Sequence, residues 1–530
     1  MTGDKRVYLF DSTLRDGAQT QGVDFSVNDK LAIAQALDRI GVDYVEGGWP
    51  GANPTDDAFF GAPPSFKRAK FVAFGMTRRP GRSASNDPGL TALLNAKTAA
   101  ICMVGKSWDF HVDVALGISR TENIDMIVES VEHAKGRCGE VMFDAEHFFD
   151  GYKANPQYAL DCAVAAYKAG ARWVVLCDTN GGTLPHEIER IVGAVTEKVP
   201  GINLGIHCHN DTENAVANSL AAIRAGVRQV QGTLNGLGER CGNANLISLI
   251  PSLMLKSDFT VGLTEQDLKQ LTHVSRLLDE RLNRAPNRSA AYVGESAFAH
   301  KGGLHVSAVE KDPRTYEHIE PHLVGNRRHI VVSDQSGRAN ILARFREIGL
   351  DVDADDGKVA TLVETVKLRE YDGYAYDGAE ASFELLARRA LGSVPTFFKL
   401  ARFRVMDERR WNVRGELETE SEATVTLDIE GQPLMTVATG NGPVNALDTA
   451  LRKALLPHYP GLADMRLVDF KVRILTPQAG TEAITRVMIE SADDAGERWT
   501  TVGVSPNIID ASFEALNDAI TWKLLKSGAR

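Results

Sequence analysis

Cysteine is scarce and scattered in this sequence. Six cysteines occur among 530 residues, none forms a Cys-x-x-Cys pair, and none follows Cys241. A disulfide framework needs regularly spaced pairs, so these cysteines indicate reduced thiols in a cytoplasmic protein. Basic charge is also in short supply, because 59 Lys plus Arg stand against 70 Asp plus Glu and give a net charge of -11. That balance excludes a general nucleic-acid binder, which needs a basic surface.

Long apolar runs are lacking as well. No stretch reaches the ~18 residues that a membrane span requires, and residues 1–6 lack the apolar core of a signal peptide. We therefore expect neither a membrane partner nor a secreted protein. A chain of 530 residues is too long for one ordinary hydrophobic core, so two to four domains are expected.

What the first half does contain is a regular alternation of β-rich and helical segments. Amphipathic stretches such as 28–40, 158–169 and 213–225 separate eight short β-rich runs. These runs are residues 7–10, 42–46, 71–74, 98–104, 141–143, 173–177, 204–206 and 229–231. Strands alternating with helices indicate βαβ units, and eight of them in ~250 residues predict a closed (β/α)₈ TIM barrel. A doubly wound open sheet is the alternative, but its G-x-G-x-x-G fingerprint does not follow the first run.

Polar residues follow nearly every predicted strand. They are Asp11, Arg15, Asp16, Glu46, Asp144, Glu146, Asp178, Thr179, Asn180, His207, His209, Glu239, Arg240 and Asn243. Any one of them is explained as a helix cap or a loop carboxylate. Together they would meet at the C-terminal mouth of the barrel, where barrel enzymes build their active sites.

The pair His207 and His209 predicts half of a metal site. Side chains alternate faces along a strand, so the two imidazoles project to one side and Cys208 to the other. The alternative is that both histidines are ordinary half-buried polar residues. The surrounding polar residues favour the metal site.

The pattern changes twice beyond the barrel. Helix-period segments at 265–282, 338–348, 358–370 and 379–390 surround the Gly- and His-rich stretch 298–306, which predicts a helical extension. From about residue 396, strand-like runs alternate and two helices, 445–455 and 509–524, close two loose copies of one unit. Such an internal α+β repeat is typical of a small-ligand or dimerisation module.

Three motifs together resemble the metal-dependent Claisen-condensing synthases of the DRE-TIM metallolyase superfamily. These motifs are Asp11-Ser12-Thr13-Leu14-Arg15-Asp16-Gly17, His207-Cys208-His209-Asn210-Asp211 and Gly238-Glu239-Arg240-Cys241-Gly242-Asn243-Ala244. The family comprises isopropylmalate, homocitrate and citramalate synthases and is related to hydroxymethylglutaryl-CoA lyase. The resemblance spans nearly the whole chain, but the first two motifs are shared with lyases and aldolases.

Further features narrow the resemblance. Gly303-Leu304-His305 with Tyr316 is similar to the synthases' helical extension, Ser336-Gly337-Arg338 stands where they carry such a tripeptide, and the C-terminal repeat resembles their amino-acid-sensing domain. The segment 46–51, Glu-Gly-Gly-Trp-Pro-Gly, departs from the form of isopropylmalate and homocitrate synthases and looks most like the citramalate-forming branch.

The resemblance implies a set of site residues. Asp16, His207, His209 and Asn243 would bind a divalent Mn²⁺, Mg²⁺ or Zn²⁺ ion, for which mixed nitrogen and oxygen ligands are suited. Arg15 would stabilise the alkoxide that forms on a 2-oxo acid, Thr179 would bind the acid's carboxylate, and Glu46 would contact the substrate or orient Arg15. Glu146, His305 and Tyr316 would act on the thioester, and which of them is the base is left open.

The implied activity is the condensation of acetyl-CoA, as co-substrate, with pyruvate to give citramalate and CoA in isoleucine biosynthesis. The resemblance further implies a homodimer and an isoleucine effector. The alternatives are an isopropylmalate or homocitrate synthase, a thioester lyase, and a non-catalytic amino-acid sensor. The predicted domains are a catalytic barrel at 1–275, a helical linker that contributes to the active site at 276–395, and an α+β regulatory, dimerising domain at 396–530.

Overall fold

A computed structural model of the chain describes residues 5–332, 338–350 and 357–529. It divides into two compact units, Met1–Phe298 with Ile319–Arg328 and Ala299–His318 with His329–Arg530. None of the helices in the described ranges is long and apolar enough to cross a membrane. Ser336 and Gly337 of the predicted tripeptide lie outside the described residues.

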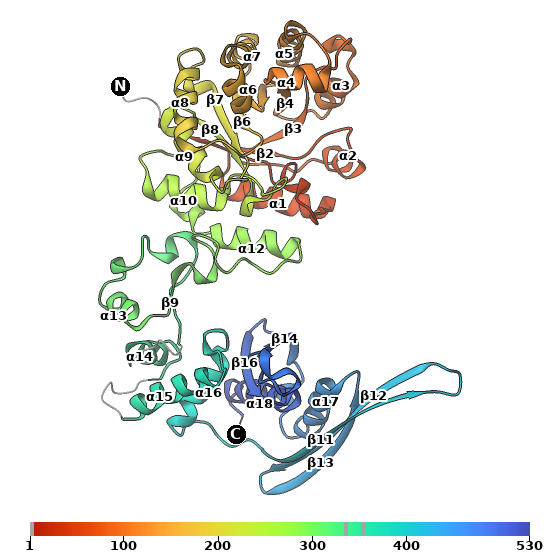
Figure 1. Cartoon of the computed structure of the whole chain (residues 1–530), viewed down its shortest axis with the longest axis vertical. Helices are drawn as coiled ribbons and strands as arrows, with labels where there is room; N and C mark the ends of the chain where they lie inside the picture. The colour runs from red at the N-terminus through yellow and green to blue at the C-terminus, as the bar shows by residue number, and fades with distance from the viewer. Residues whose placement is uncertain (1–4, 333–337, 351–356, 530) are drawn as a thin grey trace. The chain divides into compact units, whose positions relative to one another are not determined.

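Eight parallel strands of the first unit close into a barrel (Figure 1). They are β1 (Tyr8–Asp11), β2 (Tyr44–Glu46), β3 (Lys70–Met76), β4 (Ala100–Lys106), β5 (Glu140–Glu146), β6 (Trp173–Asp178), β7 (Leu204–Cys208) and β8 (Gln229–Gly232). They pair in chain order, and β8 pairs with β1 to complete the ring. The predicted (β/α)₈ barrel is therefore confirmed, and the open sheet is wrong.

Helices follow the strands around the barrel. The longer ones are α1 (Val27–Ile40), α2 (Pro54–Gly61), α3 (Pro88–Asn95), α5 (Arg120–Lys135), α7 (Pro156–Ala169), α8 (Pro185–Thr196), α9 (Ala215–Ala225) and α10 (Leu246–Lys256), and α4 (Asp109–His111) and α6 (Phe148–Ala154) are short. Local sequence sets their limits. Ser26 begins α1 with a capping box to Asp29, and Gly41 ends it with φ of 88°, a left-handed conformation that favours glycine.

Alternation along the strands sorts side chains into two layers. Outward residues such as Leu9, Ile206 and Val230 pack under the helices. Inward residues, including Phe10, Tyr44, Met142 and Trp173, form a separate apolar cluster inside the barrel. The inward residues that follow them, at the C-terminal strand ends, are polar, so the polar groups meet above an apolar floor.

The predicted helix 265–282 is two helices, α11 (Glu265–Leu268) and α12 (Leu271–Arg281). In the second unit, α13 (Gly303–Lys311) begins within the Gly- and His-rich stretch and contains its last residues, so His305 lies on a helix. The next three predicted helices are present as α14 (Arg338–Glu347), α15 (Gly357–Tyr371) and α16 (Glu380–Ala390). Short strands β9 (Ala299–His300) and β10 (His329–Ile330) pair in parallel before them.

The C-terminal repeat consists of two βββα units. The first is β11 (Lys399–Trp411), β12 (Leu417–Ile429), β13 (Gln432–Gly440) and α17 (Pro443–Leu455), and the second is β14 (Arg466–Ile474), β15 (Thr485–Ala492), β16 (Arg498–Ser505) and α18 (Ile508–Lys526). Each sheet is antiparallel and three-stranded. The predicted α+β repeat is confirmed. Strand β11 was missing from the prediction, because its run Asp407-Glu408-Arg409-Arg410 has no apolar alternation at an exposed edge.

Candidate active site

A buried cluster of one carboxylate and two imidazoles lies at the C-terminal mouth of the barrel. His207 Nε2 is 3.3 Å and His209 Nε2 is 3.8 Å from Asp16 Oδ2. One ligand atom from each of the three residues lies within 4.8 Å of the others. As strand alternation predicts, the two imidazoles share a face, with ring centroids 5.2 Å apart, while Cys208 packs in the layer under the helices.

Hydrogen bonds in the loop after β1 hold Asp16 in this position. The Asp11 carboxylate accepts from the backbone N–H and the hydroxyl of Thr13, at 2.9 and 2.8 Å, and the Thr13 oxygen accepts from the N–H of Leu234 after β8. Ser12 accepts from the Asp16 N–H at 3.3 Å and donates to Glu46. The loop is therefore fixed to both neighbouring strands.

Asn243 joins the cluster through the backbone. It pairs with His209 across an isolated β-bridge, and the next residue, Ala244, donates its N–H to the Cys208 carbonyl at 3.0 Å. The Asn243 Nδ2 donates to the Leu237 carbonyl at 3.2 Å, which leaves its side-chain oxygen as the acceptor end. The backbone pairing thus brings Asn243, the fourth predicted ligand, beside His209.

The donor set fits a divalent cation. Asp16 Oδ1, His209 Nδ1 and Asn243 Oδ1 are buried without a hydrogen-bond partner, and buried polar atoms are normally paired. Burial, followed by the neighbouring His207, lowers the pKa of His209 to about 4, so its imidazole is neutral as a ligand must be. Burial opposes ionisation of Asp16, but Arg15 and His207 outweigh it and hold its pKa well below the ordinary range.

The pKa of His207 moves the other way. Burial lowers it, but the hydrogen bond and charge of Asp16 outweigh burial and raise it above the ordinary histidine value. Asp16 and His207 therefore each favour the charged form of the other.

Arg15 lies beside the cluster in a fixed orientation. Its Nε donates to Glu46 Oε2 at 2.8 Å, its Nη1 donates to Asp16 Oδ2 at 3.2 Å, and its guanidinium carbon is 3.9 Å from the centre of the Phe74 ring. Glu46 is fully buried, and burial raises its pKa against the opposing effect of Arg15. Only the planar guanidinium of arginine can donate to two carboxylates and stack on an aromatic ring at the same time.

Glu146 and Thr179 lie at the ends of β5 and β6. Glu146 forms an ion pair with Lys106 of β4. The Thr179 hydroxyl oxygen accepts from the His147 backbone N–H at 2.8 Å, and the Thr179 carbonyl accepts from Arg240 at 2.7 Å. Lys106 was not among the predicted site residues, although its place in the inward register of β4 points to it.

His305 and Tyr316 lie together on the second unit. Their rings stack with centroids 4.1 Å apart, and both side chains are exposed. The other predicted site residues all belong to the first unit. Nearby, His300 and Glu317 form a buried pair at 3.0 Å.

Three family profiles cover most of the chain. The profile of the HMGL-like family matches residues 6–278, that of the homocitrate synthase post-HMGL domain-like family matches 292–370, and that of the LeuA allosteric (dimerisation) domain matches 377–524. The domain boundaries predicted at 275 and 395 stay predictions.

Curated relatives align over almost the full length. The chain is 52% identical to the (R)-citramalate synthase of Aquifex aeolicus and 51% identical to that of Geobacter sulfurreducens, covering 98% of each chain in both cases. The probable 2-isopropylmalate synthase of Methanopyrus kandleri is 33% identical over 96% of this chain and 97% of its own.

The barrel and the buried Asp-His-His cluster at its mouth define an enzyme of the HMGL-like class, and the cluster is a candidate metal site. Within that class the chain belongs to the (R)-citramalate synthase family. The resemblance to the citramalate-forming branch is confirmed.

Proposed function

We propose that the protein is an acyltransferase that condenses acetyl-CoA with pyruvate to give citramalate and CoA, in isoleucine biosynthesis. The observation that carries the chemistry is the fixed guanidinium of Arg15 beside the Asp16, His207 and His209 cluster. The choice of pyruvate rests on the relatives, because identity is 52% to a citramalate synthase and 33% to a probable 2-isopropylmalate synthase.

Asp16, His207, His209 and Asn243 hold a divalent Mn²⁺, Mg²⁺ or Zn²⁺ ion in this proposal. Support comes from the buried, unpartnered oxygens Asp16 Oδ1 and Asn243 Oδ1 and from the mixed nitrogen and oxygen donor set. When bound, such an ion supplies Lewis-acid polarisation of a chelating 2-oxo acid.

Arg15 and Thr179 bind the oxo acid. Glu46, Asp16 and the Phe74 ring fix the guanidinium of Arg15, so it can donate to the ketone oxygen as negative charge develops there, at little cost in reorganisation. The Thr179 oxygen already accepts the His147 N–H, so its own hydroxyl hydrogen is available to donate to the substrate carboxylate.

Glu146, His305 and Tyr316 act on the thioester. A base among them takes a proton from the acetyl methyl group, the resulting enolate carbon bonds to the ketone carbon of pyruvate, and the new alkoxide takes up a proton. Water then cleaves the thioester and releases CoA. The Lys106 ion pair orients the Glu146 carboxylate.

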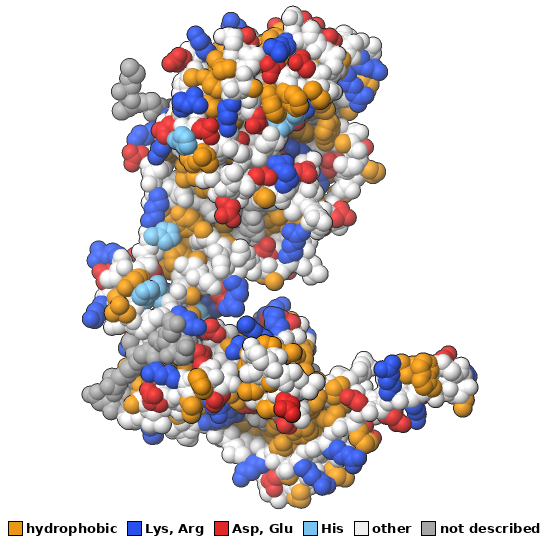
Figure 2. All heavy atoms as spheres, in the orientation of Figure 1, with side chains coloured by type: hydrophobic (Ala, Val, Ile, Leu, Met, Phe, Trp, Pro, Cys, Tyr) orange, Lys and Arg blue, Asp and Glu red, His pale blue; other side chains and the backbone are white. Residues whose placement is uncertain are grey.

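We propose that the C-terminal repeat mediates homodimerisation and binds isoleucine. Exposed hydrophobic side chains occur along the β11–β12 hairpin (Figure 2), with Met406, Trp411 and Leu417 exposed by 45, 70 and 39%. The β11–β12 hairpin by itself is a two-stranded ribbon, and such a ribbon is only marginally stable in water. Its apolar side chains therefore favour burial against a second copy of the domain.

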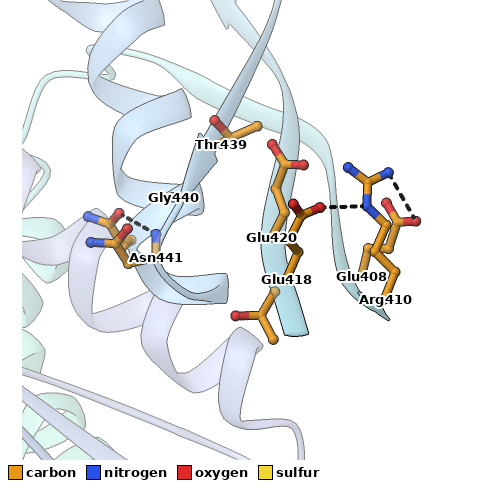
Figure 3. A pocket seen from close by; sticks show the side chains of 9 residues that line it. Glu408, Arg410, Glu418, Glu420, Thr439, Gly440 and Asn441 are labelled. Atoms are coloured by element: carbon orange, nitrogen blue, oxygen red, sulfur yellow. Dashed lines mark hydrogen bonds and ion pairs between the residues drawn. The ribbon is translucent and has the colours of Figure 1, made fainter. Parts of the chain in front are cut away.

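A cavity of about 490 Å³ adjoins the turn that leads into α17. Figure 3 shows Glu408, Arg410 and Glu418 of the hairpin on one side and Asn441 before the helix on the other. Acidic side chains suit the ammonium group of an amino acid, and a helix N-terminus suits its carboxylate. The lining is polar, so the apolar side chain of isoleucine would need further surface, for which the second copy is the proposed source.

Two experiments test these proposals on the full chain. Free thiol release from acetyl-CoA, measured with a panel of 2-oxo acids, should be highest with pyruvate. Calorimetry should detect isoleucine binding, and Glu420→Gln in the cavity lining should weaken it while Glu364→Gln, on exposed α15, should not. If the wild type does not bind isoleucine, the effector proposal is wrong, and the catalytic proposal is unaffected.

A further inference from the structure

Gln231 bridges a proposed metal ligand and a buried carboxylate. It lies on β8, where its Cα pairs with that of His207 on β7, and its side chain is 1% exposed. Its Oε1 is 2.8 Å from His207 Nδ1, and its Nε2 donates to Asp144 Oδ1 on β5 at 3.1 Å. No step of the proposed reaction uses Gln231 or Asp144.

The partners of Gln231 determine which way its amide points. An amide has one acceptor end and one donor end. The nitrogen of the Gln231 amide donates to the Asp144 carboxyl at 3.1 Å, and a carboxyl oxygen is a natural acceptor for an NH₂ group. The NH₂ of Gln231 therefore faces Asp144, and its oxygen faces His207.

This orientation determines the tautomer of His207. The Gln231 oxygen can only accept, so His207 Nδ1 carries a hydrogen. The ring atom left with a lone pair for a cation is then Nε2. That atom lies 3.3 Å from the Asp16 carboxylate and faces the cluster.

We propose that Gln231 is a positioning residue that fixes the orientation and tautomer of His207, and that Asp144 in turn fixes the Gln231 amide. The inference rests on the proposed metal site. Histidine ligands generally donate their other N–H to a carboxylate or carbonyl, and removing that partner costs about 10- to 100-fold in metal affinity. Here an amide oxygen takes the direct role, and the carboxylate acts one hydrogen bond further away.

The same strand offers a matched control. Gln229 also points into the barrel and is fully buried, but its Nε2 faces Met142 Sδ at 3.5 Å and its Oε1 has no hydrogen-bond partner. Replacing it should disturb the packing of the barrel interior to a similar degree without touching His207.

The experiment is a Mn²⁺ titration of metal-free, full-length protein by calorimetry, with the melting temperature of each metal-free variant measured in parallel. Gln231→Leu should bind Mn²⁺ about 10- to 100-fold more weakly than wild type, and Gln229→Leu should bind like wild type. The double variant Gln231→Glu with Asp144→Asn keeps an acceptor for the Nδ1 hydrogen and a donor facing it, so it should recover most of the affinity. Gln231→Asn keeps the amide but is one methylene too short to reach His207, so it should also bind Mn²⁺ weakly. If Gln231→Leu does not fold, the affinity of Gln231→Asn tests the role of Gln231 instead.

If a folded Gln231→Leu or Gln231→Asn variant binds Mn²⁺ with wild-type affinity, the role of Gln231 is wrong. The proposed metal site is unaffected by that result, because it would bind the ion without help from Gln231. An equal loss in Gln229→Leu also overturns it, since the effect would be one of packing. Failure of the wild type to bind Mn²⁺ or Zn²⁺ overturns the metal site and this inference together.

Discussion

Asp16 Oδ2 lies 3.3 Å from His207 Nε2, although Asp16 follows the first strand of the barrel and His207 lies on the seventh. Both side chains are almost completely buried, at 4 and 6% exposure. Burying charged groups is unfavourable unless they are paired or bind a cation. Substitution of either residue is therefore a direct test of the proposed metal site.

Replacing His207 by Ala should abolish metal binding, with a loss of at least about 100-fold in affinity, because a ligand matters more than its supporting shell. Replacing Cys208 by Ala should leave binding intact, since that thiol packs on the opposite face under the helices. Metal content after dialysis, read by mass spectrometry, distinguishes the two. Full activity of exhaustively chelated, metal-free wild type would count against the site.

Arg15→Lys should lower kcat by about 100- to 1,000-fold, the usual loss when a donor to a developing oxyanion is removed. Lysine keeps the charge but cannot contact Glu46 and Asp16 together, as the guanidinium does. Steady-state kinetics with pyruvate give the result. An unchanged kcat with a raised KM would show that Arg15 binds the ground state and the transition state equally and so does not stabilise the developing charge.

Because the Asp11 carboxyl is buried, we expect the stability of the barrel to depend on pH. Burial, the largest influence, raises the pKa of Asp11 from 3.8 to about 7. Between pH 4 and 7 the unfolded chain releases this proton while the folded chain keeps it, so its stabilising effect is complete below about pH 4 and is lost as pH rises toward 7.

Asp11→Asn should remove that slope, which amounts to at most about 4 kcal/mol. The asparagine oxygen can still accept the Thr13 N–H. Urea unfolding of both proteins at pH 4.5 and 7 measures the difference. Parallel changes of unfolding free energy in the two proteins would contradict the prediction.

His305→Ala should lower kcat by about 100-fold or more, as expected for a proton-transfer group, while pyruvate binding persists. His322→Ala is the control, because His322 is an exposed histidine that pairs with the neighbouring Glu320. Calorimetry with pyruvate and kinetics with acetyl-CoA separate binding from turnover. Equal activity of His305→Ala and wild type would remove His305 from the mechanism, and recovered activity on mixing His305→Ala with Glu146→Gln protein would assign it to a partner chain's site.

The barrel was predictable because its strands are short apolar runs between helical segments, a pattern that tolerates few alternatives. The same alternation could have found Lys106 and Gln231, which continue the inward register of β4 and β8. The edge strand β11 gave no such signal, since its outer half is charged on both faces. Nor does spacing show that Gln231 and Asp144, far apart in sequence, share a hydrogen bond across the barrel.

The decisive measurement for the proposed activity is the ratio of kcat/KM for pyruvate to that for 2-oxoisovalerate, on metal-loaded, full-length protein with acetyl-CoA. The two acids differ by two methyl groups, and each such group is worth about 1–3 kcal/mol in a fitted pocket. We expect kcat/KM to be at least about 10-fold higher for pyruvate. A preference for 2-oxoisovalerate would contradict it and reassign the protein as an isopropylmalate synthase.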